Sequence, residues 1–254
     1  MKNNLLSKQL KQAYIALDGE HFNKEHFQVN GGRYLKMIGF IPYSSSARKI
    51  LDIGCGYCYL TKFLKRQGTE VFGVDFYYGT VPENRCHQSG IPYSQLNIET
   101  DDLPFGENFF DVVLLGEVLE HFTHSPLVPL ARIKNALRPG GRLILTTPNA
   151  RRFTHLAKIL LGQNIYPDLM SYYQEPYSHK GKDFYYRHNR LYTMKELHQL
   201  LTQAGFKTLS SGFVREGIYW KDSPKKILFK LLTYLILSAF PPFRDFLWVV
   251  AEKK

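Results

Sequence analysis

The chain has 254 residues, of which 44% are hydrophobic, and a formal net charge of +11 at pH 7. This length and apolar content support a sizeable buried core and argue against a disordered chain, so we expect one domain with insertions. A surface of this charge attracts phosphates, anionic lipids or acidic glycans without choosing among them. Nucleic acid and an anionic membrane surface therefore stay open as partners, and the sequence does not indicate an oligomeric state.

The first residues and the cysteines bear on the compartment. Residues 1–18 are punctuated by lysines and contain no apolar run of signal-peptide length, so we expect a cytoplasmic protein, with a peripheral membrane location left open. Three cysteines cannot form a four-thiolate zinc site. Cys55 and Cys58 have the C-x-x-C spacing of redox and metal sites, but they lie inside a glycine-rich turn, and we interpret them as reduced thiols.

The first half of the chain alternates short apolar runs with helical patterns. Residues 1–47 predict one or two helices that form an N-terminal lid, and a main domain follows over 48–254. Within that domain the apolar runs recur at intervals of roughly 20–40 residues; they cover residues 49–53, 70–74, 93–97, 111–115 and 142–147. This alternation is typical of an α/β fold, doubly wound around a mostly parallel sheet with helices on both faces.

The second half of the chain predicts an insertion and then two more strands, which brings the sheet to seven. Residues 150–190 carry seven lysines and arginines against three acids, interleaved with eight aromatics, and we interpret them as a substrate cap after the fifth strand. A helix over Thr193–Ala204, closed by Gly205, precedes a strand at Lys207–Val214, and a final strand is expected at Phe246–Ala251.

An apolar helix at residues 227–240, inside the segment 225–242, precedes the last strand. Its 14 residues contain Lys230 and are too few to cross a bilayer, which requires about 20. The pattern fits either packing against the sheet or a helix lying in a membrane interface.

A turn of one acid and two glycines follows the first strand, at Asp52-Ile53-Gly54-Cys55-Gly56. Such a turn lets the backbone approach a ligand, and the helix after it, at about residues 57–66, points its positive end at a negative group. Asp75 closes the second strand 23 residues after Asp52, where it can accept ribose hydroxyls. These features indicate a nucleotide-like cofactor.

Further motifs separate the cofactor classes. ILDIGCG, VFGVD, LPFGENFFDVV, EVLEHF and ALRPGGRLILTTPN follow in order, and over residues 48–148 and 192–214 the sequence resembles the class I S-adenosylmethionine-dependent methyltransferases, which have a Rossmann-like fold. The resemblance implies S-adenosyl-L-methionine as the cofactor. It also implies that Asp75 holds the ribose and that Asn97 and Ile98 meet the adenine edge.

The same resemblance assigns the methionine end of the cofactor. It implies that Asp52, Gly54, Cys55 and Gly56 shape the methionine pocket, and that Leu115 offers its carbonyl to the amino group. The sequence departs from the family pattern at Cys58, where a third glycine is usual, and at Asn97, where an acid is common. An amide can still hydrogen-bond to an adenine amine.

Two acids and a histidine follow the fourth strand. Glu117, Glu120 and His121 are spaced i, i+3 and i+4, which predicts one shared face of a helix start. The E-x-x-E-H arrangement resembles that of ubiquinone-biosynthesis O-methyltransferases and of small-RNA 2′-O-methyltransferases, which implies that these residues hold Mg²⁺ or another divalent cation, with His188 as a later ligand. His121 and Glu117 are also the catalytic candidates: His121 as a metal-free general base is an equal alternative, and a structural role is the third.

The resulting functional hypothesis is a methyltransferase acting on a hydroxyl of a small molecule, a sugar or similar metabolite with adjacent oxygens, including a lipid-linked one. One rival hypothesis is methylation of a terminal RNA 2′-hydroxyl, favoured by the charge and the basic, aromatic cap. A rival from another class is a non-catalytic scaffold or membrane-surface binding module.

Overall fold

A computed structural model of the protein describes residues 2–19, 23–42, 48–76, 80–166, 170, 173, 175–185, 187–216 and 223–254. Its α-helices are α1 (Lys2–Asp18), α2 (Lys24–Phe40), α3 (Tyr59–Arg66), α4 (Thr80–Gln88), α5 (Leu127–Ala136), α6 (Phe153–Leu160), α7 (Met194–Gln203) and α8 (Pro224–Ala239). Its strands are β1 (Lys49–Ile53), β2 (Glu70–Asp75), β3 (Tyr93–Gln95), β4 (Phe110–Gly116), β5 (Leu137–Pro148), β6 (Tyr177–His179), β7 (Lys182–Phe184), β8 (Phe206–Val214) and β9 (Phe246–Lys253). Short 3-10 helices occur at η2 (Leu119–His121) and η4 (Pro241–Phe243).

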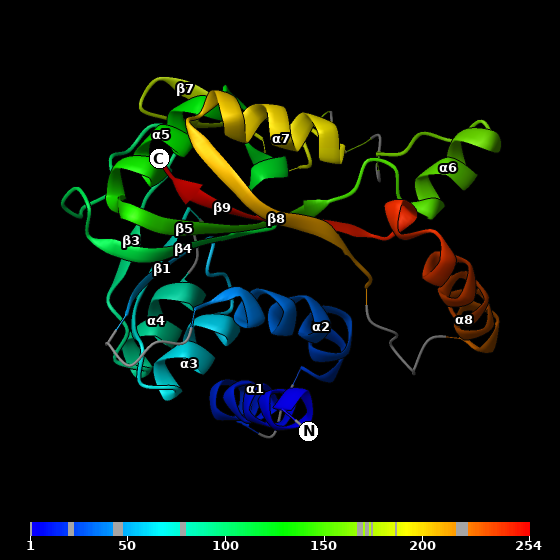
Figure 1. Ribbon diagram of the computed structural model, residues 1–254, viewed down its shortest axis with the longest axis horizontal. Coiled ribbons are helices and arrows are strands. Elements are labelled where there is room, and N and C mark those ends of the chain that lie inside the picture. Colours follow the sequence, from blue (N-terminus) through cyan, green and yellow to red (C-terminus); the bar gives the residue numbers. More distant parts are fainter. Residues whose placement is uncertain are drawn as a thin grey trace.

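A seven-stranded sheet in the order β3-β2-β1-β4-β5-β9-β8 forms the centre of the fold (Figure 1). The strands β3, β2, β1, β4 and β5 are parallel, and β9 pairs antiparallel with both β5 and β8. The predicted α/β fold with a mostly parallel seven-stranded sheet is thus confirmed. The order reverses at β1 and β4, and parallel sheets of this kind bind ligands beyond the carboxyl ends of such strands.

Helices cover both faces of the sheet in two layers (Figure 1). On one face lie α5 and α7, which bury Leu130, Ile133 and Leu197 against the sheet in one apolar cluster. On the other face lie α1, α2, α3 and α4, whose apolar side chains form a second cluster that includes Met37 and Phe63. Thr193 begins α7 with a capping box, since its hydroxyl accepts from Glu196 N–H while the Glu196 carboxylate accepts from Thr193 N–H.

The N-terminal helices, predicted as a lid, share this second cluster with the sheet. Tyr14 of α1 is fully buried and stacks on Tyr59 of α3 with ring centroids 3.6 Å apart. From α2, Met37 and Ile38 are buried, and so is Arg33, which is only 6% exposed. The helix α2 therefore brings one cation into the interior next to β4 and β5.

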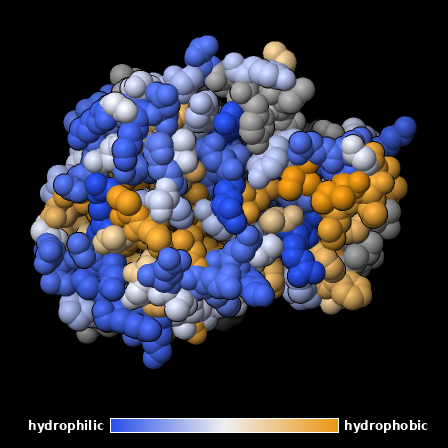
Figure 2. All heavy atoms as spheres, turned by 90° about the horizontal axis from the view of Figure 1, so that it is seen from above, coloured by the Kyte–Doolittle hydropathy of each residue, from blue (hydrophilic) through white to orange (hydrophobic). Residues whose placement is uncertain are grey.

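Two helices, α6 and α8, project from the end of the sheet where β5 stops (Figure 1). Apolar side chains are exposed at this end (Figure 2); they are Ile159, Leu160, Leu161, Leu228, Leu231 and Phe240. The predicted helix 227–240 is thus displaced by a few residues and lies away from the sheet faces. No helix in the described part of the chain combines the length and apolar content needed to traverse a bilayer.

Candidate active site

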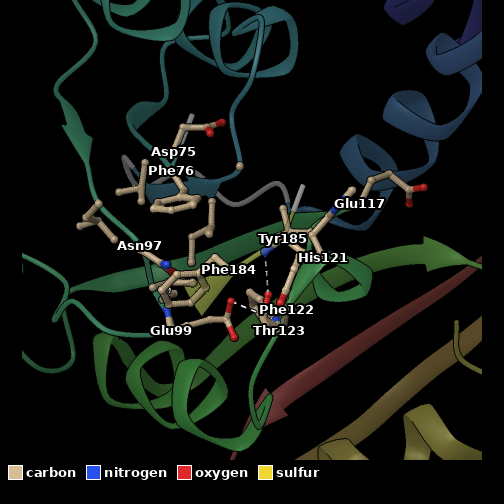
Figure 3. A pocket seen from close by; sticks show the side chains of 16 residues that line it. Asp75, Phe76, Asn97, Glu99, Glu117, His121, Phe122, Thr123, Phe184 and Tyr185 are labelled. Carbon is tan, nitrogen blue, oxygen red and sulfur yellow. Dashed lines mark hydrogen bonds between the residues drawn. The ribbon is translucent and has the colours of Figure 1, made fainter. Parts of the chain in front are cut away.

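A cavity of about 260 Å³ opens at the carboxyl ends of β1, β2 and β4 (Figure 3). Its wall is mainly apolar, with a few acidic, amide and imidazole groups; the lining residues are Ile53, Gly54, Val74, Asp75, Phe76, Leu96, Asn97, Ile98, Glu99, Glu117, Val118, His121, Phe122, Thr123, Phe184 and Tyr185. An apolar pocket with few convergent polar groups at this edge of an α/β sheet is the expected form of a ligand site.

The glycine turn forms one wall of the cavity. Gly54 has φ of +73°, and a β-carbon there would collide with the Val118 side chain, so both the conformation and the space require glycine. Gly54 N–H and Cys55 N–H both donate to Val74 O, which fixes the turn against β2. Gly56 N–H donates to the Asp75 carboxylate over 2.7 Å. The turn therefore positions Asp75, and both are predicted to bind the same cofactor.

Four of the predicted cofactor residues, Gly54, Asp75, Asn97 and Ile98, line the cavity. Asp52, Cys55, Gly56 and Leu115 are absent from its lining. Asp52 accepts from the Thr61 hydroxyl over 2.7 Å, and burial raises its pKa to about 7. Leu115 is fully buried in the apolar cluster under α5 and α7.

Asn97 lines the cavity (Figure 3). Its Oδ1 accepts from Glu99 N–H over 2.9 Å, and its buried Nδ2 has no hydrogen-bond partner. An amide oxygen has two lone pairs, so Oδ1 can still accept from an adenine amine, and that contact stays a prediction. Glu99 accepts from Thr123 and His124 N–H, which ties the loops after β3 and η2 together.

Aromatic rings close the cavity from the β6–β7 hairpin. Phe184 and Tyr185 enter it beside Phe76, and the Phe76 and Phe184 ring centroids are 5.8 Å apart. The hairpin is anchored because Asp101 accepts from His179 Nε2 at 3.1 Å and from Lys180 Nζ at 2.7 Å. Sequence reasoning missed these residues. The aromatic-rich composition of the predicted cap was the only signal, and residues 167–169, 171–172, 174 and 186 of that cap lie outside the described residues.

Glu117 does not begin a helix, so the predicted shared helix face is wrong. It has φ of +57°, its N–H donates to Thr146 O, and only the 3-10 turn η2 follows. The hydrogen bond to β5 holds Glu117 in line with β4, and its left-handed backbone conformation then turns the chain away from the strand. The Glu117 side chain faces Arg33 of α2 at 3.9 Å. Burial raises the pKa of Glu117, and the guanidinium opposes that rise.

Glu120, His121 and His188 come together instead. One potential ligand atom from each lies within 4.8 Å of the other two. The chain holds them by backbone bonds, since Asn189 N–H and Arg190 N–H donate to Glu120 O, and the Asn189 amide donates to His121 O. These hydrogen bonds hold the residues next to His188 against η2.

The protonation states of this group follow from its contacts. His121 Nδ1–H donates to Arg187 O over 3.0 Å, which leaves Nε2 with its lone pair. Burial lowers the pKa of His121 and lowers that of His188 to about 4, so both rings are neutral. Burial and the nearby Glu117 raise the pKa of Glu120, which is 1% exposed; its Oε2 accepts from Thr147, and its Oε1 has no hydrogen-bond partner.

These groups fit a divalent cation in part. Two imidazoles with available lone pairs and an unpartnered buried carboxylate oxygen are suitable donors for such an ion. Glu117 stands outside the group because Arg33 already faces it. The candidate ligand set is therefore Glu120, His121 and His188, without Glu117.

Comparison with known proteins adds relatives. A family model described as a methyltransferase domain matches residues 25–211. The ubiquinone biosynthesis O-methyltransferase of Ruegeria pomeroyi is 33% identical over 178 residues, which cover 69% of this chain and 66% of that protein. The protein of the same name from Roseobacter denitrificans is 31% identical over 182 residues, with 70% and 68% covered. For that of Cereibacter sphaeroides the match is 36% identical and spans only 44% of the relative.

Solved structures share the fold at low identity. A putative S-adenosylmethionine-dependent methyltransferase from Listeria monocytogenes has a TM-score of 0.59 and 18% identity, with 88% of this chain and 99% of that chain covered. The 1,6-didemethyltoxoflavin-N1-methyltransferase of Burkholderia thailandensis, solved with its substrate and S-adenosylhomocysteine, has a TM-score of 0.55 and 19% identity, with 99% and 90% covered.

Proposed function

The chain belongs to the methyltransferase-domain family, and we propose that it transfers the methyl group of S-adenosyl-L-methionine to a hydroxyl of a small molecule. The observation that carries the proposal is His121, whose Nε2 keeps its lone pair at the wall of an apolar cavity because Nδ1–H is held by Arg187 O. The curated relatives named as O-methyltransferases support oxygen as the acceptor atom.

The cavity residues suit the parts of the cofactor. The methionine end would lie against Gly54 and Val118, and Asp75 would accept from the ribose hydroxyls. The adenine would lie against the aromatic rings of Phe76 and Phe184, with the Asn97 amide at its edge. Each assignment matches a group to its complement: a tight turn to a zwitterion, a carboxylate to hydroxyls, and rings to a flat base.

Methyl transfer from a sulfonium is an in-line displacement, so the protein must align the acceptor oxygen and remove its proton. His121 is neutral and can take that proton at Nε2. The Arg187 carbonyl stabilises the ring once it is charged, because it continues to accept from Nδ1–H. In this proposal Glu117 positions the acceptor or the cofactor and does not take part in proton removal.

As the alternative to a metal-free base, we propose that Glu120, His121 and His188 hold Mg²⁺ or a similar cation, in which case His121 Nε2 binds the ion and does not take the proton. When bound there, such an ion would lower the pKa of the acceptor hydroxyl and bind a second oxygen beside it. An acceptor with adjacent oxygens, such as a sugar or similar metabolite, therefore fits best. Prolonged EDTA treatment should abolish turnover and Mg²⁺ should restore it; unchanged turnover would leave His121 as a metal-free base.

The test of the proposed reaction is an assay with methyl-labelled S-adenosylmethionine and a panel of small hydroxyl compounds. His121→Ala should lower kcat by about 10²–10⁴-fold, the usual contribution of a general base. The matched control is His198→Ala on α7, a histidine that hydrogen-bonds Ser211 and lies outside the cavity, and it should keep full activity. Calorimetry without any cofactor affinity would favour the non-catalytic scaffold instead.

A second candidate acceptor is a terminal RNA 2′-hydroxyl. The position of His188 beside Glu120 and His121 favours it, because this completes the ligand set that the resemblance to the small-RNA enzymes implies. The net charge of +11 is consistent with a phosphate backbone. RNA binding that weakens steeply between 50 and 200 mM salt, together with methylation of RNA 3′ ends, would support this acceptor over a metabolite.

We also propose that the exposed apolar end at α6 and α8 touches a membrane surface. Leu160 is 87% exposed and Leu161 is 73% exposed, and Lys158 belongs to the last turn of the same helix. Apolar side chains flanked by cations suit an anionic bilayer. Cosedimentation with phosphatidylglycerol vesicles should fall sharply in Leu160→Glu/Leu161→Glu, with Leu5→Glu, an exposed leucine of α1, as the control.

A further inference from the structure

Three cysteines meet behind the glycine turn, outside the cavity. Cys55 lies within the turn, Cys58 is the N-cap of α3, and Cys86 belongs to α4. The Sγ atom of Cys58 is 2.9 Å from that of Cys86 and 4.0 Å from that of Cys55. All three are free and buried, with Cys58 and Cys86 fully inaccessible. Sequence reasoning paired Cys55 with Cys58 only, because Cys86 is far away in the chain.

The backbone conformation at Cys58 and the glycine at position 73 both accommodate these sulfurs. Cys58 holds φ of +58°, a left-handed conformation that is uncommon outside glycine, and its N–H donates to Cys55 O over 2.8 Å. Across β2, a β-carbon on Gly73 would lie 3.1 Å from the Cys86 sulfur and 3.2 Å from the Cys55 sulfur. Glycine at position 73 therefore leaves the room that the sulfurs occupy.

The cluster lies in an apolar layer, among side chains such as Phe63 and Val71. The thiols of Cys55 and Cys58 lower the pKa of Cys86 by hydrogen bonding, while the pKa values of Cys55 and Cys58 themselves are raised.

We propose that Cys55, Cys58 and Cys86 bind one thiophilic d¹⁰ metal ion through their three sulfurs. Their ligand atoms lie within 4.8 Å of one another. Metal–sulfur bonds of about 2.3 Å hold three sulfurs about 4 Å apart, so the sulfurs of Cys58 and Cys86, which are 2.9 Å apart, would separate when the ion binds. Binding would release to solvent the protons that the thiols carry.

The number of donors favours Cu(I) over Zn(II). Within the described residues, no histidine or carboxylate joins the three sulfurs as a fourth ligand. Structural zinc is almost always four-coordinate, whereas soft thiolates select Cu(I) without that requirement. The site is separate from the group of Glu120, His121 and His188, which offers harder nitrogen and oxygen ligands.

The test titrates the reduced full chain with Cu(I) against a bathocuproine chelator, and with Zn²⁺ against a chromophoric chelator. One Cu(I) per chain is expected, with weaker Zn²⁺ binding; tighter Zn²⁺ binding would support the same site and assign its ion as zinc. Cys58→Ser and Cys86→Ser should each weaken binding by at least ~100-fold, beyond the 10–100-fold typical of losing an outer-shell partner. Glu120→Gln, which alters the other candidate cluster, should leave Cu(I) affinity unchanged.

X-ray absorption on the wild-type chain gives an answer even if the serine variants fail to fold. Three sulfur neighbours at about 2.3 Å are expected. Nitrogen or oxygen neighbours in their place, no stoichiometric binding of either ion, or full affinity in a folded Cys86→Ser would overturn the proposal. A count of one free thiol in the denatured, unreduced chain would also overturn it, because Cys58 and Cys86 would then form a disulfide.

Discussion

Replacing Arg33 by Met should destabilise the protein by about 3 kcal/mol. The side chains of Arg33 and Glu117 are 7% and 19% exposed, and removing one partner of a buried ion pair costs about 3–5 kcal/mol because the other charge stays buried. The lower end applies here, since the closest atoms of the pair are 3.9 Å apart, the bond to the Thr146 hydroxyl is 3.4 Å long, and Arg33 Nε has no partner. With a urea slope of about 3 kcal/mol/M, the unfolding midpoint should fall by about 1 M.

The double variant Arg33→Met/Glu117→Gln isolates the pair. It removes both charges, so its free energy of unfolding should exceed the additive value from the two single variants by about 1–3 kcal/mol. Lys36→Met, which removes a cation from the same helix that lies over the Trp248 ring, is the matched control and should cost less than about 1 kcal/mol. Strict additivity of the two single variants would refute the argument, because Arg33 would then stabilise the fold without acting on Glu117.

Three further predictions concern the cavity and its surroundings. Gly54→Ala should weaken S-adenosylmethionine binding by at least ~10-fold in calorimetry, because it forces Val118 aside at a positive φ, whereas Gly106→Ala, where a β-carbon meets open space, should not. Phe184→Ala should lower the free energy of unfolding by about 3 kcal/mol and weaken cofactor binding as well, since Phe184 is 4% exposed. Burial raises the pKa of Asp52 to about 7 from 3.8, so over this range the folded state keeps a proton that the unfolded state loses. The free energy of unfolding should therefore fall by up to about 4 kcal/mol as pH rises from about 4 to about 7. Asp52→Asn should flatten that decline.

The strands were predictable because parallel strands buried on both faces read as continuous apolar runs. The run at 49–53 coincides with β1, and that at 111–115 lies inside β4 (Phe110–Gly116). The glycine turn was predictable for a related reason, since Gly54 must tolerate φ of +73° beside Val118. In these cases the residue types themselves record the local conformation.

The acids of the candidate active site were not predictable in the same way. The spacing of Glu117 and Glu120 fits a helix face, yet the pairing of Glu117 N–H with Thr146 O, 29 residues away, overrides that local preference. Arg33 reaches Glu117 from α2, and Phe184 reaches Phe76 from an insertion. Contacts between segments so far apart depend on how the elements pack, which the spacing of residues along the chain does not encode.

Cys58→Gly separates the role of the turn from that of the sulfur cluster. The sequence predicts that glycine here preserves cofactor binding, because a third glycine is usual in the family turn, and the φ of +58° supplies the reason: glycine adopts this conformation without the strain that a cysteine carries. The same change removes the sulfur 2.9 Å from Cys86, so Cu(I) affinity should collapse while S-adenosylmethionine affinity persists. Loss of cofactor binding would mean that the turn is misassigned, and retained Cu(I) binding would mean that the metal site lies elsewhere. Since each affinity is measured separately, one variant tests the two assignments independently.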